Sequence, residues 1–420
     1  MFPNRPAGGH RLRRVTAARP DADDPRTHAL VVIGIVLLAF NLRTAAVSVG
    51  PVLAEISESL GLSGAESGLL TSLPVLAFAG FGALTPRLAH RIGPHRLTLI
   101  AVLAATAGLF GRSLVDAAWP FLALSLLALS GMAAANVLLP SLVKRHFPDR
   151  IGLITAVYST TMAVGLTAAS VFTVPIAENY GGWRIGLAGW GVLAVAAIIP
   201  WIGLVAHDRP DGDDPPATIS MAAVARTRLG WLMALFFGVQ SLQAYAVFGW
   251  FPNLYRSVGF SASDAGLLLG AITGIGIPLS FVVPALTARD RVRLPMLWVL
   301  GGSYLIGYTG LLLAPAQGAW LWALLVGIGT TTFPMILTLI GLRARTAAGT
   351  AALSGFTQSV GYLIAAPGPF LIGVLHDLTD GWTVPLLTLI ALAVVLIWTG
   401  ALVSRPDAIE DRVAVSESTR

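Results

Sequence analysis

The chain has 420 residues, of which 55% are hydrophobic and 11% are charged, and its mean hydropathy is +0.77. A soluble domain carries about 25% charged residues, so this composition excludes a soluble protein and predicts a chain that crosses a membrane several times. The absence of cysteine excludes disulfides, thiolate metal sites and cysteine nucleophiles. The net charge of +6 would also suit a nucleic-acid-binding protein, so the positions of the basic residues decide what it means.

Apolar stretches recur along the chain, and each is long enough for a helix to cross the hydrocarbon core of a membrane. We therefore expect an all-α polytopic membrane protein with twelve transmembrane helices. The first stretch is too long for the apolar region of a signal peptide, and further spans follow it, so we interpret it as an uncleaved helix. The expected spans are 29–53, 65–86, 96–115, 119–142, 151–176, 184–205, 229–254, 264–287, 295–315, 319–342, 350–375 and 382–403.

Basic residues lie almost entirely on one side of this arrangement. With an even number of spans both termini share a side, and 23 of the 27 basic residues fall on it. Positively charged loops remain in the cytoplasm, so this bias places both termini there. It also explains the net charge without nucleic acid, and we expect a multi-pass protein of a bacterial cytoplasmic (inner) membrane. The four remaining basic residues are Arg43, Arg112, Arg184 and Arg256.

The sequence repeats itself after a shift of 198 residues. GLSGAESGLL (61–70) matches GFSASDAGLL (259–268), and Gly131 recurs as Gly329. A parallel duplication of six helices with both termini inside is typical of two-half transporters. The expected parts are a basic cytoplasmic tail (1–28), a six-helix half (29–206), a cytoplasmic linker rich in Pro and Asp (207–228), a second six-helix half (229–404) and a cytoplasmic C-terminal tail (405–420).

The loop after the second expected helix reads GALTPRLAHRIGPHR (82–96) and resembles the signature loop of the major facilitator superfamily. Two positions depart from the family pattern, because Pro86 stands where glycine is usual and His90 stands where the family has aspartate. The loss of the aspartate removes the usual contact between this loop and a neighbouring helix. The residues assigned to the signature loop are Arg87, Arg91, Gly93 and Arg96.

Three further segments look like the branch of that superfamily that contains cyanate and 2-nitroimidazole transporters. They read NLRTAAVSVGPVL (41–53), GMAAANVLLPSLVKRHFPDRIGLITAVYSTTM (131–162) and GGWR (181–184). The resemblance covers nearly the whole chain and implies the major facilitator fold and transport by alternating access. It does not name the substrate, since members of the branch handle dissimilar small molecules.

Arg43 is the only charged residue in the middle of an expected span. A charge at the centre of a membrane costs from roughly 2.5 to more than 10 kcal/mol, and the residues that remain there usually have a function. The planar guanidinium stays charged and donates several hydrogen bonds, so Arg43 is a candidate ligand for an anionic substrate. It could instead snorkel or brace another helix. Asn41 lies about 200° from Arg43 around an ideal helix, and we assign it to packing.

The other candidate ligands are amides and hydroxyls at mid-span, where they indicate an aqueous cavity or contacts between helices. The amides fall mainly on the first, fourth, seventh and eleventh helices, and the first, fourth, seventh and tenth line the central path in the superfamily. We expect one of Gln240 and Gln243 on the cavity, and at most one or two of the threonines at 330–332. The candidate substrate ligands besides Arg43 are Asn136, Tyr158, Gln240, Gln243, Thr331 and Gln358.

The middle of the spans contains no Asp, Glu, His or Lys, so nothing there suits a metal site, a catalytic pair or a proton relay. Glu66 and Asp264 each follow a serine by three residues at the start of an apolar run. This pattern predicts helix caps, although a proton-coupled carrier would have to use these acids or move the proton with its substrate.

We therefore expect a secondary transporter, with no cofactor, no metal and no enzymatic activity, rather than a channel. Its expected substrate is a small monovalent anion such as cyanate, and its only expected partners are that substrate and the lipid bilayer around a monomer. The alternative is an efflux carrier for small planar neutral compounds such as nitroimidazoles or drugs. The fifth helix lacks the Gly-Pro pair that proton–drug antiporters usually carry, which disfavours a drug exporter weakly.

The predicted membrane topology can be tested by labelling single introduced cysteines. The chain has no cysteine of its own, so none has to be removed first. Single cysteines at Ser220 and Thr346 should react with a membrane-impermeant maleimide only after the cells are opened. A cysteine at Asp116 should react in intact cells. Labelling of the Ser220 variant in intact cells would contradict the twelve-span arrangement.

Overall fold

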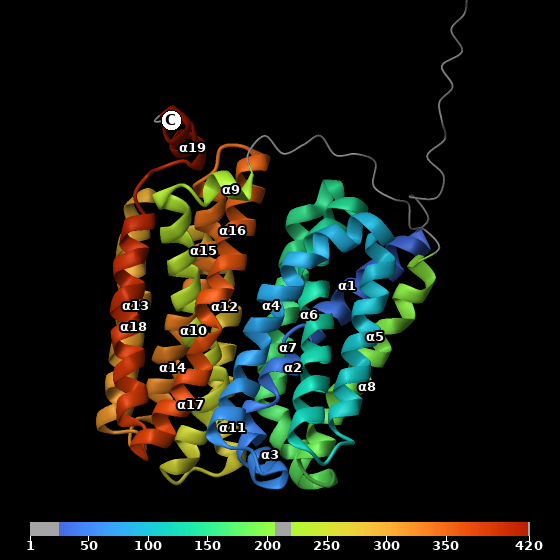
Figure 1. Cartoon of the computed structure of the whole chain (residues 1–420), viewed down its shortest axis with the longest axis vertical. Coiled ribbons are helices and arrows are strands. Elements are labelled where there is room, and N and C mark those ends of the chain that lie inside the picture. The colour runs from blue at the N-terminus through green and yellow to red at the C-terminus, as the bar shows by residue number, and fades with distance from the viewer. Residues whose placement is uncertain (1–24, 206–219, 419–420) are drawn as a thin grey trace, which may run out of the picture.

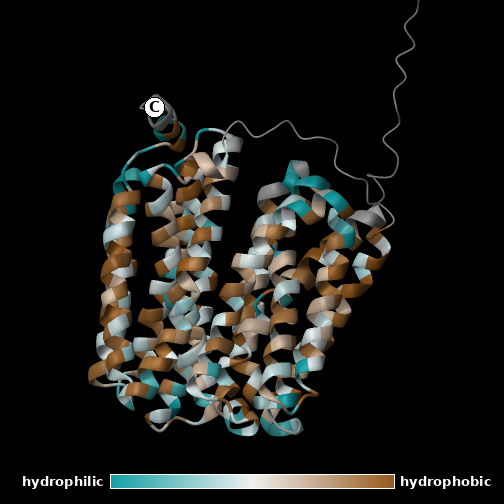
Figure 2. Ribbon diagram, in the orientation of Figure 1, coloured by the Kyte–Doolittle hydropathy of each residue, from teal (hydrophilic) through white to brown (hydrophobic). Residues whose placement is uncertain are grey.

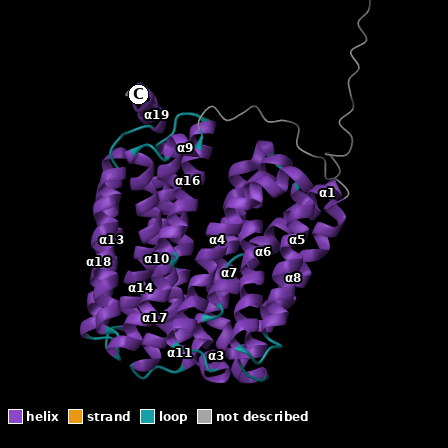
Figure 3. Cartoon of the chain, in the orientation of Figure 1, coloured by secondary structure: helices purple, strands orange, loops and turns teal. Residues whose placement is uncertain are grey.

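The computed structural model of the chain describes residues 25–205 and 220–418. These residues form helices joined by short loops and contain no strand (Figure 3). Twelve segments of the described chain are long and apolar enough to cross a membrane, which confirms the predicted number. Most of the expected N-terminal tail and of the expected linker lie outside the described residues.

The first half of the chain provides six spans, of which the first is divided into four short helices. Its elements are α1 (Pro25–Asn41), α2 (Thr44–Val47), η1 (Gly50–Val52), α3 (Leu53–Leu60), α4 (Gly64–Ile92), α5 (Pro94–Arg112), α6 (Ala118–His146), η2 (Pro148–Arg150), α7 (Ile151–Tyr180) and α8 (Trp183–Leu204).

The second half also provides six spans, and the eighth, tenth and eleventh are each divided in two. Its elements are α9 (Met221–Val224), α10 (Arg228–Ser257), α11 (Ala262–Gly274), α12 (Gly276–Thr287), α13 (Asp290–Leu313), α14 (Ala319–Thr330), α15 (Thr332–Leu342), α16 (Ala347–Ala365), α17 (Pro367–Thr379), α18 (Thr383–Val403) and α19 (Ile409–Ser418).

The two halves form two helical bundles that lie side by side (Figure 1). The helices α4 and α7 of the first bundle pack against α16, α17 and α11 of the second. The helices α5 and α8 lie at one outer edge of the molecule, and α13 and α18 lie at the other. These are the third, sixth, ninth and twelfth spans, so the structure places the spans without mid-span amides or charges at the periphery.

The outer surface of both bundles is apolar between two polar ends (Figure 2). Large hydrophobic side chains lie exposed on it, among them Phe172, Ile199, Val299 and Trp398, whose exposed fractions are 54–69%. A soluble protein rarely exposes so much apolar surface, whereas hydrocarbon solvates it without cost. This band is therefore the surface that contacts lipid.

Proline and the loss of backbone hydrogen bonds explain one of the divided spans. The eleventh span is divided at Ala366, which lies between the end of α16 at Ala365 and the start of α17 at Pro367. Proline has no N–H to continue the helical ladder and clashes with the preceding turn, which explains why the helix is broken at this point.

The two bundles are joined at the end of the molecule opposite α9 and α19 (Figure 1). The backbone N–H of Phe370 in α17 donates to Ser72 Oγ in α4 over 2.9 Å. Arg256 Nη1 lies 2.7 Å from Glu55 Oε1, which forms an ion pair between the halves. Gly50 lies directly against the backbone carbonyl of Phe248, where a Cβ atom could not fit. These contacts seal one end of the interface.

The C-terminal segment, expected to be a tail, contains the helix α19, which rests on the loop before α16. Glu410 Oε1 accepts hydrogen bonds from the backbone N–H groups of Arg345 and Thr346, both over 3.0 Å. Burial raises the pKa of the Glu410 carboxyl, but its backbone and side-chain hydrogen bonds outweigh that effect and lower the pKa overall. Arg345 also forms an ion pair with Asp411 over 2.7 Å.

The predicted helix caps are present at the sealed end. Ser63 Oγ accepts from the backbone N–H of Glu66 over 3.2 Å, and Glu66 Oε2 accepts from the backbone N–H of Ser63 over 2.9 Å. This is a capping box. Ser261 Oγ accepts from the backbone N–H of Asp264 over 3.0 Å and caps α11 with this single bond to the backbone.

We predict that Ser63→Ala lowers the stability of the protein by about 1 kcal/mol, because α4 loses its cap. Glu66→Gln should leave the melting temperature nearly unchanged, since glutamine also completes a capping box. Melting of the purified protein measures both effects, with the exposed Glu58→Gln as a control. Loss of proton-driven accumulation in Glu66→Gln, with normal substrate exchange, would instead show that Glu66 carries protons.

Candidate functional site

A cavity of about 550 Å³ lies between the two bundles. It is bounded by α7 of the first bundle and by α10, α12, α15 and α16 of the second. It extends from Arg43 toward the end of the molecule that carries α9 and α19, away from the sealed end. Its polar lining residues are Arg43, Thr155, Ser159, Thr160, Gln240, Ser241, Tyr245, Thr273, Ser280, Thr330, Thr331, Thr338 and Tyr362.

The position of Arg43 depends on the break in the first span. The helix α1 ends at Asn41, and Arg43 occupies the N-cap position of α2 with φ −114° and ψ −13°. The backbone carbonyl of Arg43 accepts from the N–H groups of Ala46 and Val47. Because the helix is interrupted here, Arg43 reaches the cavity, whereas Asn41 stays inside the first bundle and donates to the Leu37 carbonyl over 2.8 Å.

The Arg43 side chain crosses to the second bundle, where its Nη1 donates to Tyr245 Oη over 2.6 Å. Aromatic rings surround the guanidinium, whose central carbon lies 5.3 Å from the ring centre of Phe78 and 5.7 Å from that of Phe333. These contacts are cation–π interactions, and Phe78 also stacks on Tyr362 at 5.3 Å. The aromatic rings thus enclose the positive charge of Arg43, which is only 9% exposed.

Among residues 25–205 and 220–418, Arg43 forms no ion pair with an aspartate or glutamate. A tyrosine hydroxyl and aromatic rings provide only partial compensation for a full buried charge. The cavity wall therefore carries a positive charge that no described carboxylate neutralises.

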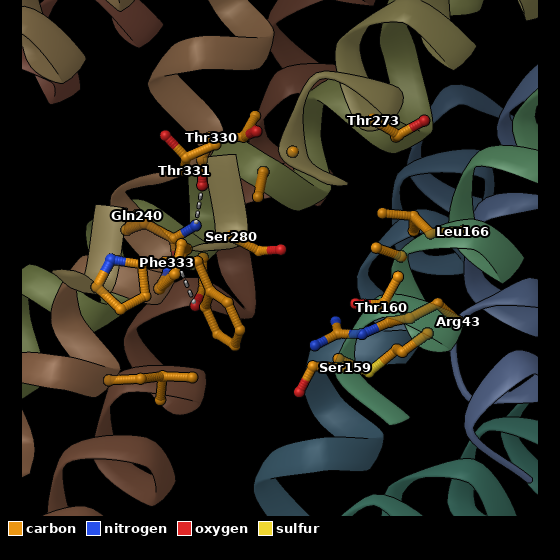
Figure 4. A pocket seen from close by; sticks show the side chains of 18 of the residues that line it. Arg43, Ser159, Thr160, Leu166, Gln240, Thr273, Ser280, Thr330, Thr331 and Phe333 are labelled. Atoms are coloured by element: carbon orange, nitrogen blue, oxygen red, sulfur yellow. Dashed lines mark hydrogen bonds between the residues drawn. The ribbon is translucent and has the colours of Figure 1, made fainter. Parts of the chain in front are cut away.

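Hydroxyl and amide groups line both sides of the cavity (Figure 4). Ser159 and Thr160 of α7 lie near Arg43, and Gln240, Thr330 and Thr331 lie on the facing wall. Gln240 Nε2 donates to the Thr330 carbonyl over 3.4 Å at the point where α14 ends. The two walls differ, since one presents a cation and hydroxyls while the other presents neutral polar groups and an aromatic ring.

The structure brings three of the predicted ligands together and leaves four away from the cavity. Arg43, Gln240 and Thr331 line the wall. The residues that do not line it are Asn136, Tyr158, Gln243 and Gln358. Gln243 is fully buried in α10, where neither side-chain atom has a hydrogen-bond partner among the described residues. Gln358 Nε2 donates to Ser354 Oγ in its own helix over 2.7 Å. The four residues are therefore not included in the proposed site.

Sequence reasoning missed the aromatic residues of the site. Ser241, Tyr245 and Phe248 occur at intervals of four and three residues along α10, which places them on one face of that helix. This periodicity was a usable signal, but apolar and aromatic residues at helical spacing are also the ordinary pattern of a packed core. Only the contact of Arg43 with Tyr245 distinguishes the two cases.

Most of the predicted signature loop is helical, and only one residue separates α4 from α5. Gly93 occupies it with φ +92°, a left-handed conformation that glycine adopts without strain. Arg87 and Arg91 lie exposed in the last turns of α4, and Arg96 lies exposed in the first turn of α5. None of the loop residues lines the cavity.

Comparison with known proteins places the chain in a family. The Major Facilitator Superfamily model matches residues 31–369. The transporter YycB of Bacillus subtilis is 36% identical over 87% of this chain and 91% of its own length. The 2-nitroimidazole transporter of Escherichia coli is 34% identical over 88% and 94%, and its cyanate transport protein CynX is 28% identical over 83% and 90%.

Solved structures agree on the fold. The nucleoside transporter NupG superimposes with a TM-score of 0.73 at 12% identity, covering 90% of this chain and 99% of that one. A bacterial homologue of the lysosomal transporter Spinster, in an inward-facing and unoccupied conformation, has a TM-score of 0.68 at 15% identity, covering 94% and 98%. The chain therefore belongs to the Major Facilitator Superfamily, and it is a multi-pass membrane transporter rather than an enzyme.

Proposed function

We propose that this transporter is a secondary carrier for a small monovalent anion and that Arg43 is the group that binds the anion. The observation that carries the proposal is the burial of Arg43 on the cavity wall without a carboxylate partner among the described residues. A buried charge that lacks a partner is expensive, and a bound anion would lower that cost.

The groups around Arg43 suit this chemistry. Its guanidinium can donate two parallel hydrogen bonds to a carboxylate or another planar anion, and Nη1 already donates to Tyr245. The hydroxyls of Ser159 and Thr160 lie on the same side of the cavity and could donate to the remaining oxygen atoms of the anion. The relative named as a cyanate transport protein supports an anionic substrate.

We propose that the end of the molecule that carries α9 and α19 faces the cytoplasm, as the distribution of 23 of 27 basic residues favours. The cavity then opens inward, and the contacts that include Glu55 with Arg256 close the outer side. Transport by alternating access would require these contacts to break while the cytoplasmic ends of the bundles approach each other.

A second candidate is a carrier for small planar neutral compounds. The aromatic lining favours it, because Phe333 and Tyr362 offer flat apolar surfaces beside the hydroxyls of the cavity. The relative named as a 2-nitroimidazole transporter supports it as well. A neutral substrate would leave the charge of Arg43 without a counter-charge, and for this reason we rank it second.

Arg43 variants separate the two candidates. The purified protein is first screened by thermal shift with cyanate, nitrate, benzoate and 2-nitroimidazole, because a ligand of the native state raises the melting temperature. Arg43→Gln should weaken anion binding about 10- to 150-fold, which corresponds to the loss of roughly 1.5–3 kcal/mol from charge-assisted hydrogen bonds. Arg43→Lys should bind more weakly than the wild type, because it keeps the charge and loses the planar fork.

The outcomes are distinct. A well-folded Arg43→Gln protein that retains the wild-type anion affinity would remove Arg43 from the site. Stabilisation by 2-nitroimidazole alone, unchanged in Arg43→Gln, would support the neutral-compound carrier. Arg184→Gln, at the start of α8 in the same bundle and away from the cavity lining, is the matched control and should bind anions as the wild type does.

Tyr245→Phe tests the link between the bundles. It removes the hydroxyl that accepts from Arg43, and a hydrogen bond to a charged group contributes about 1.5–3 kcal/mol. The ligand-free variant should melt below the wild type. A saturating anion should raise its melting temperature more than that of the wild type, because the anion takes over the freed donor of Arg43. Equal shifts in both proteins would show that the anion does not bind at this donor.

A further inference from the structure

A second buried arginine, Arg112, lies in the first bundle and has no place in the site described above. It occupies the last turn of α5 and is fully buried, and it does not line the cavity. Within the described part of the chain it pairs with no carboxylate, and its Nε has no hydrogen-bond partner. A fully buried guanidinium without a counter-charge needs a physical reason.

Its hydrogen bonds point to that reason. Arg112 Nη1 donates to the backbone carbonyl of Ala45 over 3.2 Å, and Nη2 donates to Ser48 Oγ over 3.3 Å. Both acceptors belong to the interrupted first span. In a continuous helix the Ala45 carbonyl would accept from the N–H of Val49, but α2 ends at Val47 and that backbone bond does not form. Arg112 supplies the missing donor.

A freed carbonyl inside a membrane is destabilising unless another group donates a hydrogen bond to it. Interrupted membrane helices are tolerated where side chains or neighbouring helices form hydrogen bonds with the freed backbone groups. Arg112 therefore stabilises the interrupted form of the span against a continuous helix, in which its donors would have no free carbonyl to bind.

The duplicated half of the chain is an internal comparison. With the shift of 198 residues, Arg43 corresponds to Ser241 and Arg112 corresponds to Gly310. The helix that corresponds to the first span is α10 (Arg228–Ser257), which runs without interruption for 30 residues. The interruption and the two arginines thus occur together in one half and are absent together from the other.

The interruption decides where Arg43 points. The two residues that Arg112 holds lie within or directly after α2, and Arg43 is the N-cap of that same short helix. The backbone of Arg43 is joined to α2 through its carbonyl, which accepts from Ala46 and Val47. A shift of α2 would therefore move the Arg43 side chain with respect to Tyr245 and the cavity.

We propose that Arg112 is a positioning residue for Arg43: it replaces the missing backbone donor of the interrupted first span and so fixes the anion-binding guanidinium at the cavity wall. The inference rests on the proposed function, since it assigns Arg112 a role in anion affinity. Arg112 itself does not touch the substrate.

The test compares Arg112→Lys with Arg43→Gln, Arg184→Lys and the wild type. The probes are cyanate, nitrate and benzoate as anions and 2-nitroimidazole as the neutral compound. Arg112→Lys keeps a buried cation but loses the fork that spans both acceptors. We expect anion affinity to fall about 10- to 100-fold, because a misplaced guanidinium loses charge-assisted hydrogen bonds to the anion. The affinity for 2-nitroimidazole should change much less.

A merely structural arginine would lower the yield and melting temperature of the variant, while the folded fraction would keep the wild-type ratio of anion to neutral affinity. That ratio is therefore the deciding measurement. If Arg112→Lys does not fold, Ser48→Ala replaces it, because it removes one acceptor of Arg112 and leaves the Ala45 bond. An unchanged ratio in the variant that folds overturns the inference.

The controls keep two failures apart. If Arg43→Gln binds the anions as the wild type does, the proposed function fails. If Arg43→Gln loses anion binding while the ratio is unchanged in Arg112→Lys, only the positioning role of Arg112 fails. Arg184→Lys should match the wild type throughout, because Arg184 bonds the exposed Asp116 and does not line the cavity.

Discussion

The rest of the site depends on one constraint: a permanently charged guanidinium is held inside a membrane bundle at an interruption of the first span. Arg43 is the N-cap of α2, directly after the interruption, and from there its side chain crosses to the second bundle and donates to Tyr245. Aromatic rings of both bundles then enclose the charge. The cavity, its hydroxyl lining and the proposed preference for an anion all follow from where this one charge lies.

The same arginine joins the two halves at the level of the cavity. Beyond it, on the side away from α9 and α19, the interface is closed by polar contacts such as Ser72 with the Phe370 backbone and Glu55 with Arg256. An anion that competes for the Arg43 donors would weaken the link to Tyr245. Ligand binding would in this way change the contact between the bundles on which alternating access depends.

Much of the fold was predictable because membrane solvation acts on long segments. The twelve spans, the duplicated halves and the caps at Ser63 and Ser261 follow from apolar length and local hydrogen-bonding chemistry. The interruption at Leu42 and Arg43 was not predictable, because its stabilising partner Arg112 is distant in the sequence. The helical phase was equally undetermined: Gln240 and Gln243 lie only about 60° apart around an ideal helix, yet Gln240 lines the cavity and Gln243 lies in the core.

The central claim is that an anion binds at Arg43, and the distance between them tests it most directly. Solid-state NMR on protein labelled with ¹⁵N-arginine, in the presence of ¹³C-labelled cyanate or benzoate, whichever stabilises the protein more, measures dipolar coupling between guanidinium and anion. The account predicts a coupling that corresponds to charge-assisted contacts of about 2.7–2.9 Å between nitrogen and oxygen, and its loss in Arg43→Gln. Persistence of the coupling in Arg43→Gln, or its absence from the wild type with the anion bound, would contradict the account.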